Sequence, residues 1–403
     1  MNKSSLTSPA AWLIYSMSLM VGALYALVVP GLSYFLAEEL QVRPVLIGLF
    51  FVSVALSAMM YGQTISLWSE RTFNQKKLIA FSMFVGGLAC FGFAHFRSYP
   101  MVLITATTLF SLSFIAATQI LGLARQYADE NLSAQQQSMF NALVRASVAL
   151  AWVIGPPLGF SLLQKINFAE LYRLTGVLYF LVALVALFLL PNVKLPSQNN
   201  EEITPQAKRY LYPAVLAFAL LFAANQSYMI ALPLFLKKVL FLDVHYAGWM
   251  YGLAAACEIP IMIFAAWLGS RFTLTSFIRV GALAALALNA GVWLADYLWQ
   301  MMVLQIFNAL FIGFVAGVGI NWFQWKMPAY SHAPLALYLS SISIGNVIGS
   351  VVIATVAELY SYRDIFLVNV FVCTLAILIF LLGRCEGRSI VAKLFRRSAL
   401  KPL

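Results

Sequence analysis

Long apolar stretches follow one another along almost the whole chain, separated by short polar connections. A helix needs about 20 apolar residues to cross the hydrocarbon core of a membrane, because each residue adds about 1.5 Å. The stretches are continuously apolar and do not alternate, which excludes a membrane β-barrel. The pattern predicts twelve membrane-spanning helices near residues 10–35, 45–68, 78–96, 100–123, 138–162, 171–191, 211–236, 244–269, 277–296, 299–325, 333–356 and 364–383.

One polar run interrupts this pattern in the middle of the chain. Residues 192–209 are rich in Pro, Asn, Gln and Glu, as is typical of a solvated linker. Six predicted helices precede the run and six follow it. The predicted organisation is therefore a six-helix bundle at 1–191, a cytoplasmic linker at 192–210, a second six-helix bundle at 211–383 and a basic cytoplasmic tail at 384–403.

The two predicted bundles also share short sequence echoes. The matching positions are Phe35, Leu36, Leu40 and Gly48 with Phe235, Leu236, Leu240 and Gly248, and Val153, Ile154 and Gly155 with Val347, Ile348 and Gly349. Together with the count of six helices on each side, these echoes predict two pseudo-symmetric halves. In such a design the substrate site lies between the halves, near the middle of the membrane.

Composition and charge add a location and an orientation. The chain has 403 residues, of which 62% are hydrophobic and 10% charged, and its mean hydropathy is +0.87. These values lie far outside the range of soluble domains and indicate an all-α integral membrane protein. Seventeen of the 25 Lys and Arg residues fall on the side of the termini and seven on the other, with Arg145 inside a span. Both termini are therefore expected in the cytoplasm.

The net charge of +11 follows mostly from this topology, so no nucleic-acid partner is expected. The basic tail is instead suited to lie on anionic lipid. Four scattered cysteines give neither a disulfide nor a metal-site pattern, and no glycine-rich nucleotide motif occurs. We expect no cofactor, no metal and a monomer.

An enzyme is a poor interpretation of this sequence. Its three histidines, His95, His245 and His332, lie in separate connections or at span edges and show no catalytic spacing with acids. A non-transporting sensor would share the predicted fold, and only the absence of solute flux would distinguish it from a transporter.

Arg145 is an unusual residue to find within an apolar span. It lies about two turns, or about 10 Å, inside the fifth span. A lipid-facing Arg at that depth costs about 2.5 kcal/mol or more, so its side chain is expected to face protein or water. Two roles remain open: a structural Arg that reaches the headgroups or pairs with Asp129 and Glu130, and a cavity residue that binds solute.

Ten residues after Arg145, the same span contains a Gly-Pro-Pro element. Gly155 and Gly159 share one helix face and allow another helix to approach closely, while Pro156 and Pro157 bend the segment. The element is either a pivot between moving helices or a static kink.

Glu258 is the one carboxylate that we place well inside a span. It lies about 21 Å into a core about 30 Å thick. Burial of a carboxyl group favours its protonated form, which is the property that a proton carrier requires. Pro260 would loosen the helix beside it. The alternative is a structural acid that never changes its protonation state.

Amide and aromatic side chains cluster on the spans expected to line a central cavity. Singly, each residue is more simply an interhelical hydrogen-bond partner; as a set, they suit a solute rich in hydroxyl groups. The set comprises Asn225, Gln226, Tyr228, Gln305, Asn308 and Gln324.

These residues carry a resemblance to a known family. The twelve-helix layout resembles the major facilitator superfamily, and AWVIGPPLGF (151–160) is similar to its antiporter motif in helix five. LARQYAD (123–129), CEIPIMI (257–263) and LQIFNALFIGFVAGVGINWFQ (304–324) resemble the sugar efflux transporters more specifically. The resemblance implies proton-linked export of sugars or glycosides from a bacterial cytoplasm. It points to Arg145, Glu258, Gln305, Asn308 and Gln324 as functional residues, and to Arg125 and Asp129 as a loop charge pair.

Two departures from the superfamily pattern bear on this expectation. The loop after the second span keeps only the charges Glu70, Arg71, Lys76 and Lys77 of the usual motif. Lys326 stands where an acidic residue would be expected, and a cation at the cytoplasmic mouth would favour anionic cargo.

The sequence therefore predicts a proton-coupled exporter of a sugar or glycoside in the bacterial inner membrane, working by alternating access. The alternatives are the same machinery exporting an anionic metabolite such as a carboxylate siderophore, or a drug, and an uptake symporter, since sequence does not fix direction.

Overall fold

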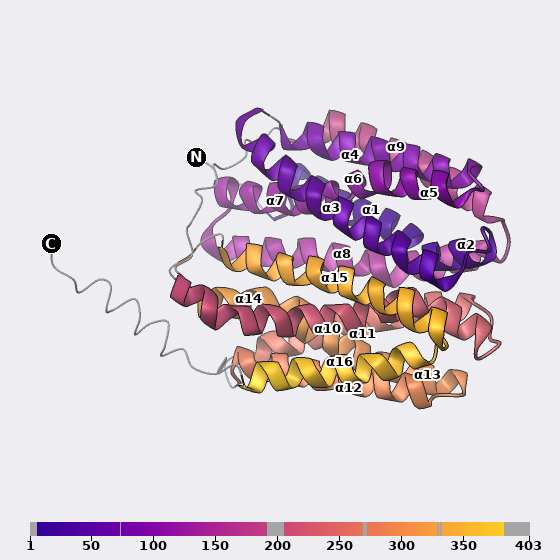
Figure 1. Ribbon diagram of the computed structural model, residues 1–403. Coiled ribbons are helices and arrows are strands. Elements are labelled where there is room, and N and C mark those ends of the chain that lie inside the picture. The colour runs from indigo at the N-terminus through magenta and orange to yellow at the C-terminus, as the bar shows by residue number, and fades with distance from the viewer. Residues whose placement is uncertain are drawn as a thin grey trace.

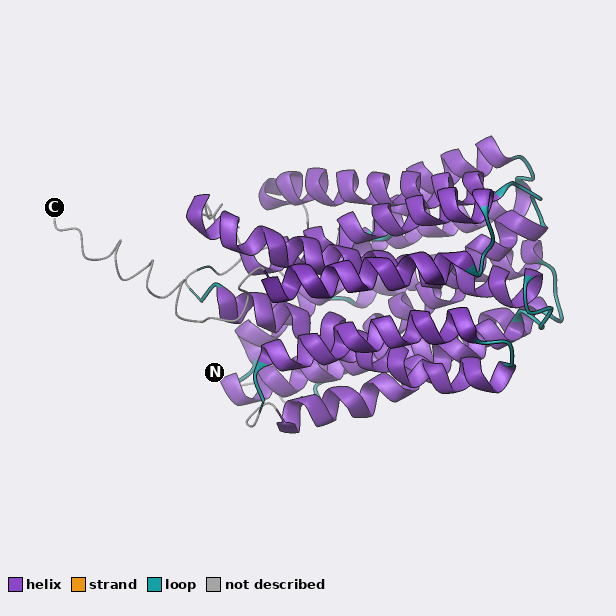
Figure 2. Cartoon of the chain, turned by 60° about the horizontal axis from the view of Figure 1, so that its bottom comes forward, coloured by secondary structure: helices purple, strands orange, loops and turns teal. Residues whose placement is uncertain are grey.

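The computed structural model describes residues 6–72, 74–191, 205–268, 272–328, 330 and 333–382. All regular structure in these residues is helical (Figure 2). Twelve helical segments are long and apolar enough to cross a membrane, as the hydropathy pattern predicts. The predicted tail and most of the predicted linker lie outside the described residues, but 205–210 already belong to the first helix of the second half.

The first six spans contain some interrupted helices and some continuous ones. Their elements are α1 (Pro9–Val28), η1 (Val29–Gly31), α2 (Leu32–Glu38), α3 (Pro44–Thr72), α4 (Gln75–His95), α5 (Tyr99–Thr105), η2 (Ala106–Phe110), α6 (Ser111–Ser113), α7 (Ile115–Asn131), α8 (Ala134–Leu163) and α9 (Phe168–Leu189). The first span comprises α1 to α2, and the fourth comprises α5 to α7.

The second six spans repeat this plan. Their elements are α10 (Pro205–Lys238), α11 (His245–Leu268), α12 (Leu274–Leu294), α13 (Leu298–Phe311), η3 (Ile312–Ala316), α14 (Gly317–Lys326), α15 (Ala333–Leu359) and α16 (Asp364–Leu382). The tenth span comprises α13 to α14.

Short polar residues start several of the helices at the membrane edge. Ser133 caps α8 in a reciprocal capping box with Gln136, and the side chains of Asn167 and Thr273 accept hydrogen bonds from the first turns of α9 and α12. Such caps satisfy backbone N–H groups that have no partner within the helix. They explain why the helices begin directly after connections of only a few residues.

Two spans contain a π-helical turn in their middle. Ala106–Phe110 forms η2 in the fourth span, and Ile312–Ala316 forms η3 in the tenth. The hydroxyl of Ser111 donates to the carbonyl of Ala106 at 2.9 Å and to that of Val54 on α3 at 3.2 Å. π-turns are rare and occur often at functional sites. Hydropathy does not reveal them, because neither segment contains a proline or a charged residue that would mark an irregular turn.

The backbone confirms that the two halves are related. Gln41 and Phe241, which are 200 residues apart, both adopt a left-handed conformation, with φ of 49° and 55°. Each follows a helix end with the same hydrogen bonds: Leu40 N–H donates to the Phe35 carbonyl, and Leu240 N–H donates to that of Phe235. The sequence echoes therefore mark equivalent turns.

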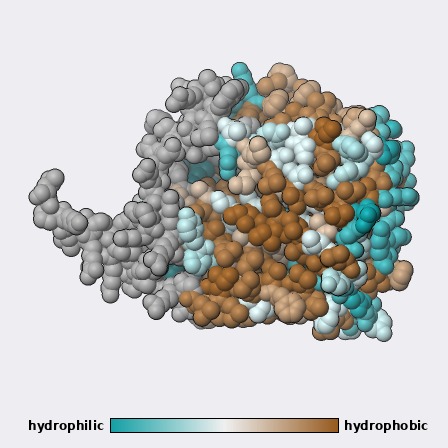
Figure 3. Space-filling view, in the orientation of Figure 1, coloured by the Kyte–Doolittle hydropathy of each residue, from teal (hydrophilic) through white to brown (hydrophobic). Residues whose placement is uncertain are grey.

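The spans run antiparallel along one bundle, so the chain enters and leaves it at the same end, on the left in Figure 1. We call this the terminal end and the opposite one the distal end. Apolar side chains cover the middle of the bundle in the view of Figure 3, and polar side chains gather at the distal end, on the right. This distribution is that of a protein embedded in lipid.

The halves meet closely along their distal parts. A β-carbon added to Gly48 of α3 would lie 2.4 Å from the backbone N of Ala354 on α15, and one added to Gly248 of α11 would lie 2.6 Å from the carbonyl oxygen of Pro156 on α8. These two equivalent glycines allow helices of opposite halves to pack backbone against backbone.

A buried amide network ties three helices of the second half together. Asn369 of α16 donates to Asn289 of α12 at 2.9 Å and to the Ala224 carbonyl of α10 at 3.2 Å, and it accepts from Ser227 at 2.8 Å. The three polar side chains are at most 2% exposed. Because every hydrogen bond in the network stays inside this half, the half is suited to move as one body.

Candidate functional site

Two charged side chains lie in the terminal half of the bundle on α8 and α11, helices of opposite halves that pack against each other. Arg145 lies on α8 and is exposed, whereas Glu258 lies on α11 and is half-buried. The charges of both residues act on the hydroxyl of Tyr338 on α15, so the three groups share one region. Glu258 forms no ion pair within 4 Å among the described residues.

The sequence gives no direct signal for Tyr338. It lies in the apolar run APLALYL (333–339) at the start of α15, is 7% exposed and packs against the rings of Phe218, Phe222 and Phe323. Its hydroxyl donates to the carbonyl of Ala316 at 2.7 Å. Only the packing of the helices brings it near Arg145 and Glu258.

Three predicted solute-binding amides remain accessible. Asn225 and Gln226 on α10 are half-buried, and their side chains form no hydrogen bond with any described residue. Gln324 on α14 is exposed. These amides therefore keep donors and acceptors free for a solute.

The other three predicted binding residues form a hydrogen-bonded cluster inside the second half, in which only Asn308 Oδ1 has no hydrogen-bond partner. The hydroxyl of Tyr228 donates to Gln305 Oε1 at 3.0 Å, and Asn308 Nδ2 donates to the same oxygen at 3.2 Å. Gln305 Nε2 donates to the Met301 carbonyl at 2.8 Å. All three side chains are at most 2% exposed. In this conformation they position α10 against α13.

We expect Tyr228→Phe to lower the stability of the protein and to leave its apparent affinity for solute within about twofold. The change removes one buried interhelical hydrogen bond, worth about 0.6 to 2 kcal/mol in a membrane protein. Thermal unfolding in detergent and the transport KM measure the two effects. A KM that rises tenfold with unchanged stability would instead place Tyr228 in contact with solute.

The Gly-Pro-Pro element lies at the boundary between the halves. α8 continues through Pro156 and Pro157 to Leu163 without a break. A β-carbon at Gly155 would lie 2.5 Å from Ala26 Cβ on α1, and one at Gly252 of α11 would lie 2.6 Å from Pro157 Cγ. The element is therefore held between α1 of its own half and α11 of the other. It occupies the place that a pivot requires.

The remaining hinge candidates show the same continuity. The β-carbon position of Gly159 lies 3.1 Å from the Leu27 carbonyl oxygen of α1. Pro260 lies within α11, two residues after Glu258, and the helix continues to Leu268. Neither residue ends its helix.

The predicted loop charge network is only partly described. The side chains of Glu70 and Arg71 lie outside the described part of the chain, and Lys76 and Lys77 lie in the first turn of α4. Arg125 and Asp129 lie on helix α7, not in a loop, and both are exposed. Among the described residues they form no ion pair with each other within 4 Å, although they are one turn apart.

The Lys326 side chain is not presented at the bundle mouth as the sequence suggested. Lys326 is 6% exposed, and its Nζ lies 5.3 Å from the ring centre of Trp322 and 4.8 Å from that of Trp325. Indole faces attract cations, so they hold this ammonium within the protein. This cation is consequently a poor attractant for anionic cargo.

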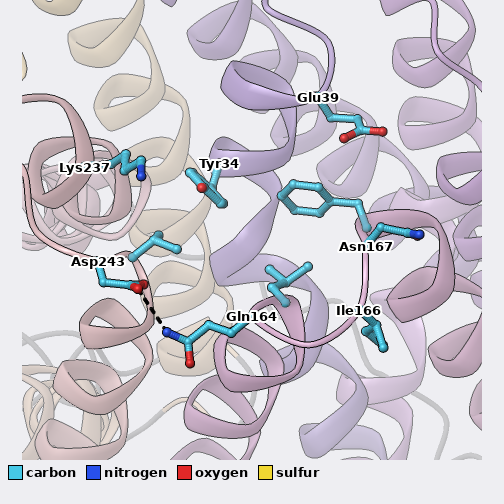
Figure 4. Close-up of a pocket in the computed structure, with 10 residues that line it drawn as sticks. Tyr34, Glu39, Gln164, Ile166, Asn167, Lys237 and Asp243 are labelled. Atoms are coloured by element: carbon cyan, nitrogen blue, oxygen red, sulfur yellow. Dashed lines mark hydrogen bonds between the residues drawn. The ribbon is translucent and has the colours of Figure 1, made fainter.

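A polar latch closes the distal end between the halves. Gln164, at the end of α8, donates from Nε2 to Asp243 Oδ2 at 3.0 Å (Figure 4). The same Nε2 lies 2.8 Å from His245 Nδ1. His245 Nδ1 lies 3.0 Å from Asp243 Oδ1. The latch borders a pocket of about 370 Å³ that is lined by Tyr34, Glu39, Leu163, Gln164, Ile166, Asn167, Phe168, Lys237, Asp243 and Val244.

Two further contacts join the halves at the same end. Arg43 forms an ion pair with Glu358, which also accepts a hydrogen bond from the Val45 backbone at 3.1 Å. Lys238 Nζ lies 3.7 Å from Glu38 Oε1. Together with the contacts of Gly48 and Gly248 described above, these polar groups hold the two halves together at the distal end.

We expect the latch to weaken in acid. Hydrogen bonds from the His245 backbone N–H first, and then from the His245 and Gln164 side chains, hold the pKa of the Asp243 carboxyl below its ordinary value. A lowered pKa means that Asp243 stabilises the closed distal end above its ordinary pKa and loses this effect as the pH falls through the lowered pKa. Because the Asp243 side chain is 51% exposed, solvent screens this interaction. We therefore expect acid to shift the equilibrium between the closed and open distal ends only about two- to fivefold.

Fluorophores on cysteines that replace Lys165 and Phe241, one in each half, would report this opening by energy transfer. Both positions are exposed at the distal end. Asp243→Asn should remove the acid-dependent change. If that variant opened in acid like the parent, the latch would not be the cause.

The described residues offer no resident metal centre. No group of three or more His, Cys, Asp or Glu side chains comes together among them. Cys90 and Cys373 are buried and Cys257 is half-buried, each as a free thiol.

Comparison with known proteins identifies the family. A family model described as Major Facilitator Superfamily matches residues 14–328 and, in a second match, residues 214–402. The chain belongs to the major facilitator superfamily. It is thus a transporter and not an enzyme, as the sequence predicts.

Within the superfamily, the chain is similar to sugar efflux transporters. It is 34% identical to sugar efflux transporter A of Dickeya chrysanthemi over 368 aligned residues. The alignment covers 91% of this chain and 92% of that protein. It is 32% identical to sugar efflux transporter C of Escherichia coli strain K12 over 366 aligned residues. This alignment covers 90% of this chain and 92% of that protein.

Solved structures of other superfamily members share the fold. The nucleoside transporter NupG aligns with a TM-score of 0.73 at 14% identity, over 93% of this chain and 99% of that chain. The peptide transporter POT, solved as a variant, aligns with a TM-score of 0.77 at 13% identity, over 96% and 98%. This likeness supports the two-half, twelve-span architecture and carries no information on cargo.

Proposed function

We propose that this protein exports a sugar or glycoside from the bacterial cytoplasm in exchange for protons, by alternating access. The observation that carries the proposal is the placement of Glu258, which has no ion-pair partner among the described residues, and of Arg145 on two helices of different halves that pack against each other, α11 and α8. The surroundings of a charge on either helix change whenever the two halves move relative to each other. The similarity to sugar efflux transporters supplies the class of cargo.

Glu258 is the proton carrier in this proposal. An ionised carboxylate without a partner is costly inside a membrane protein, so Glu258 is stabilised either by a proton or by a nearby cation. Proton uptake from the outer side would remove the cost of the buried negative charge on Glu258. Loss of that proton on the inner side would restore this cost and favour the other arrangement of the halves.

The solute would bind between Arg145 and the accessible amides. Asn225 and Gln226 face the central region from α10 in this proposal, and Gln324 contributes from the terminal end of α14. Amides and a guanidinium donate and accept hydrogen bonds in the pattern that vicinal hydroxyl groups require. The cluster of Tyr228, Gln305 and Asn308 lies behind this surface and fixes α10 and α13.

The closed distal end corresponds to the outer side in this proposal. Both termini would then lie in the cytoplasm of a bacterial inner membrane, in agreement with the Lys and Arg distribution. The protein would work as a monomer and would need no cofactor beyond the proton. A cytoplasm-active reporter fused after Leu403 tests the orientation: activity supports it, and a silent but expressed fusion contradicts it.

A second candidate cargo is an anionic metabolite, such as a carboxylate chelator. The exposed guanidinium of Arg145 favours it, because Arg binds carboxylates with two parallel hydrogen bonds. The burial of Lys326 between indoles removes the other cation that pointed to such a cargo.

Inside-out membrane vesicles with an acidic interior test both cargoes together. Labelled methyl glucoside and lactose are offered beside a labelled tricarboxylate chelator. Accumulation of a sugar that collapses when the pH gradient is dissipated supports the proposal. Accumulation of the chelator alone would replace the cargo, and accumulation that requires the opposite gradient would make the protein a symporter.

A further inference from the structure

The pocket beside the polar latch is built by both halves at the distal end. The first half contributes α2, the end of α8 and the start of α9, and the second half contributes the end of α10 and the segment before α11. Its volume of about 370 Å³ lies within the range of small-molecule sites, about 300–1,000 Å³. Solvent reaches the pocket while the halves are closed, because the following polar side chains of its wall are exposed: Glu39, Gln164, Asn167, Lys237 and Asp243.

Three polar groups of the wall can form further hydrogen bonds. The Tyr34 hydroxyl and the Lys237 ammonium form no hydrogen bond or ion pair with any described residue. Asp243 Oδ2 accepts one hydrogen bond, from Gln164, and a carboxylate oxygen can accept a second. In Figure 4, Tyr34 and Lys237 lie above the hydrogen bond between Gln164 and Asp243. Tyr34 belongs to the first half, whereas Lys237 and Asp243 belong to the second.

A pseudo-symmetric counterpart of the latch has different chemistry. Asp243 stands 200 residues after Arg43, and Gln164 follows the first Val-Ile-Gly echo by nine residues, as Glu358 follows the second. The contact of Gln164 with Asp243 is therefore equivalent to that of Glu358 with Arg43, and each joins the two halves. The counterpart is an ion pair, whereas the latch sets a carboxylate against a neutral amide. The latch consequently keeps more hydrogen-bonding capacity for a ligand.

The wall suits a neutral solute that is rich in hydroxyl groups. A sugar hydroxyl can donate to the Asp243 carboxylate and accept from the Tyr34 hydroxyl or the Lys237 ammonium. The Tyr34 ring adds an aromatic surface, whose negative face attracts the C–H groups of a sugar ring. The charges of the wall are balanced: Glu39 forms an ion pair with Arg97 at 3.1 Å, and Asp243 and Lys237 offset each other. The pocket therefore has no excess positive charge that would favour an anion.

We propose that this pocket is a second solute site, which binds a neutral sugar or glycoside from the outer side and holds the distal end closed. Because both halves form its wall, a ligand that contacts Tyr34 together with Lys237 or Asp243 binds this arrangement better than one in which the halves have separated. Such a ligand shifts the equilibrium toward closure. Sugar that accumulates outside thereby slows further export. Only the identification of this ligand with the exported solute rests on the proposed function.

Tyr34→Phe is the decisive variant, because it removes one hydroxyl of the wall and keeps the ring. That hydroxyl has no hydrogen-bond partner among the described residues, so its removal costs the unliganded closed state no such contact. Tyr360→Phe is the matched control. Tyr360 is 75% exposed at the distal end of the second half and does not line the pocket.

Energy transfer between fluorophores on cysteines that replace Met101 and Trp299 measures closure without transport. Both positions are exposed near the distal starts of α5 and α13, on opposite halves and outside the pocket wall. The native cysteines are replaced by Ser, and Gly48→Ala is added to populate the open state. Lactose or methyl glucoside at about ten times its dissociation constant should shift the ratio of closed to open protein about tenfold.

The sugar titration separates the pocket from the central site. Tyr34→Phe should need about three- to tenfold more sugar for the same closure, and Tyr360→Phe should need the parental amount. A parental titration in Tyr34→Phe would overturn the proposal, since closure would then come from elsewhere. Closure by a tricarboxylate chelator but by neither sugar would also overturn it.

Export into inside-out vesicles preloaded with unlabelled sugar gives a second reading. The lumen of these vesicles corresponds to the outer side. Lumenal sugar should slow the entry of labelled sugar about threefold or more in the parent and in Tyr360→Phe, and this inhibition should weaken in Tyr34→Phe. Equal effects of lumenal sugar on Tyr34→Phe and on the parent would contradict the proposal. If neither sugar were transported while energy transfer followed the expected pattern, the proposed cargo would be wrong and the site would stand.

Discussion

Replacing Glu258 with Gln is expected to abolish accumulation driven by a pH gradient while leaving sugar-for-sugar exchange. Gln resembles the protonated acid in shape and charge, so it permits the movements of the loaded transporter but carries no proton. For one proton per solute, a gradient of one pH unit supports about tenfold accumulation. The variant should reach only equal concentrations on the two sides.

Inside-out vesicles measure the accumulation ratio, and counterflow of labelled against unlabelled sugar measures exchange. Glu170→Gln is the matched control, because Glu170 is an exposed carboxylate at the distal start of α9 that forms no ion pair among the described residues. Retained gradient-driven accumulation in Glu258→Gln would remove Glu258 from the coupling mechanism.

Adding a methyl group at Gly48 is expected to hold the distal end open and to slow transport strongly. The new β-carbon would lie 2.4 Å from the backbone N and the Cβ of Ala354, so α3 and α15 must separate. Overpacking of this kind costs about 1–3 kcal/mol, which disfavours the closed distal state by about 5- to 150-fold. The transport rate should fall accordingly, because each cycle passes through that state.

Gly62→Ala provides the control on the same helix. Gly62 is exposed near the terminal end of α3, and nothing lies within 4 Å of its β-carbon position. Energy transfer between the labels at positions 165 and 241 should drop for Gly48→Ala and stay parental for Gly62→Ala. Equal behaviour of the two variants would mean that helix propensity, and not closure between the halves, explains the effect.

Much of the architecture follows from hydropathy. A helix in lipid must make all of its backbone hydrogen bonds internally, so each membrane span is a long continuous helix that the length of its apolar stretch reveals. The sequence matches around Leu40 and Leu240 predicted that these two segments are equivalent. Both segments are helix ends followed by a left-handed residue, Gln41 or Phe241. The π-turns could not be predicted from the same signal, since residues 106–110 and 312–316 contain neither proline nor a charged residue.

The candidate functional residues divide along a similar line. Arg145 and Glu258 stand out in the sequence because charge is costly in a membrane. Tyr228, Gln305 and Asn308 stand out as polar residues too, but hydropathy cannot distinguish an amide that faces a cavity from one that faces another helix. Their mutual hydrogen bonds decide the matter for this conformation.

The contacts that the sequence did not suggest depend on the pairing of distant segments. Tyr338 meets Ala316 across two helices, and Gln164 meets Asp243 and His245 across the boundary of the halves. No local pattern encodes such meetings. Gly319 of α14 leaves room for the Tyr338 ring, whose Cε2 lies 2.9 Å from the β-carbon position of this glycine.

The most direct test of proton-coupled sugar export is proton movement by the purified protein in sealed liposomes that contain a pH-sensitive dye. With no initial pH difference, an outward sugar gradient is imposed and the internal pH is followed. Exchange predicts that sugar leaving the liposome draws protons inward, so that the interior acidifies, and that Glu258→Gln abolishes this signal. Alkalinisation of the interior, or sugar efflux without any pH change, would contradict the account.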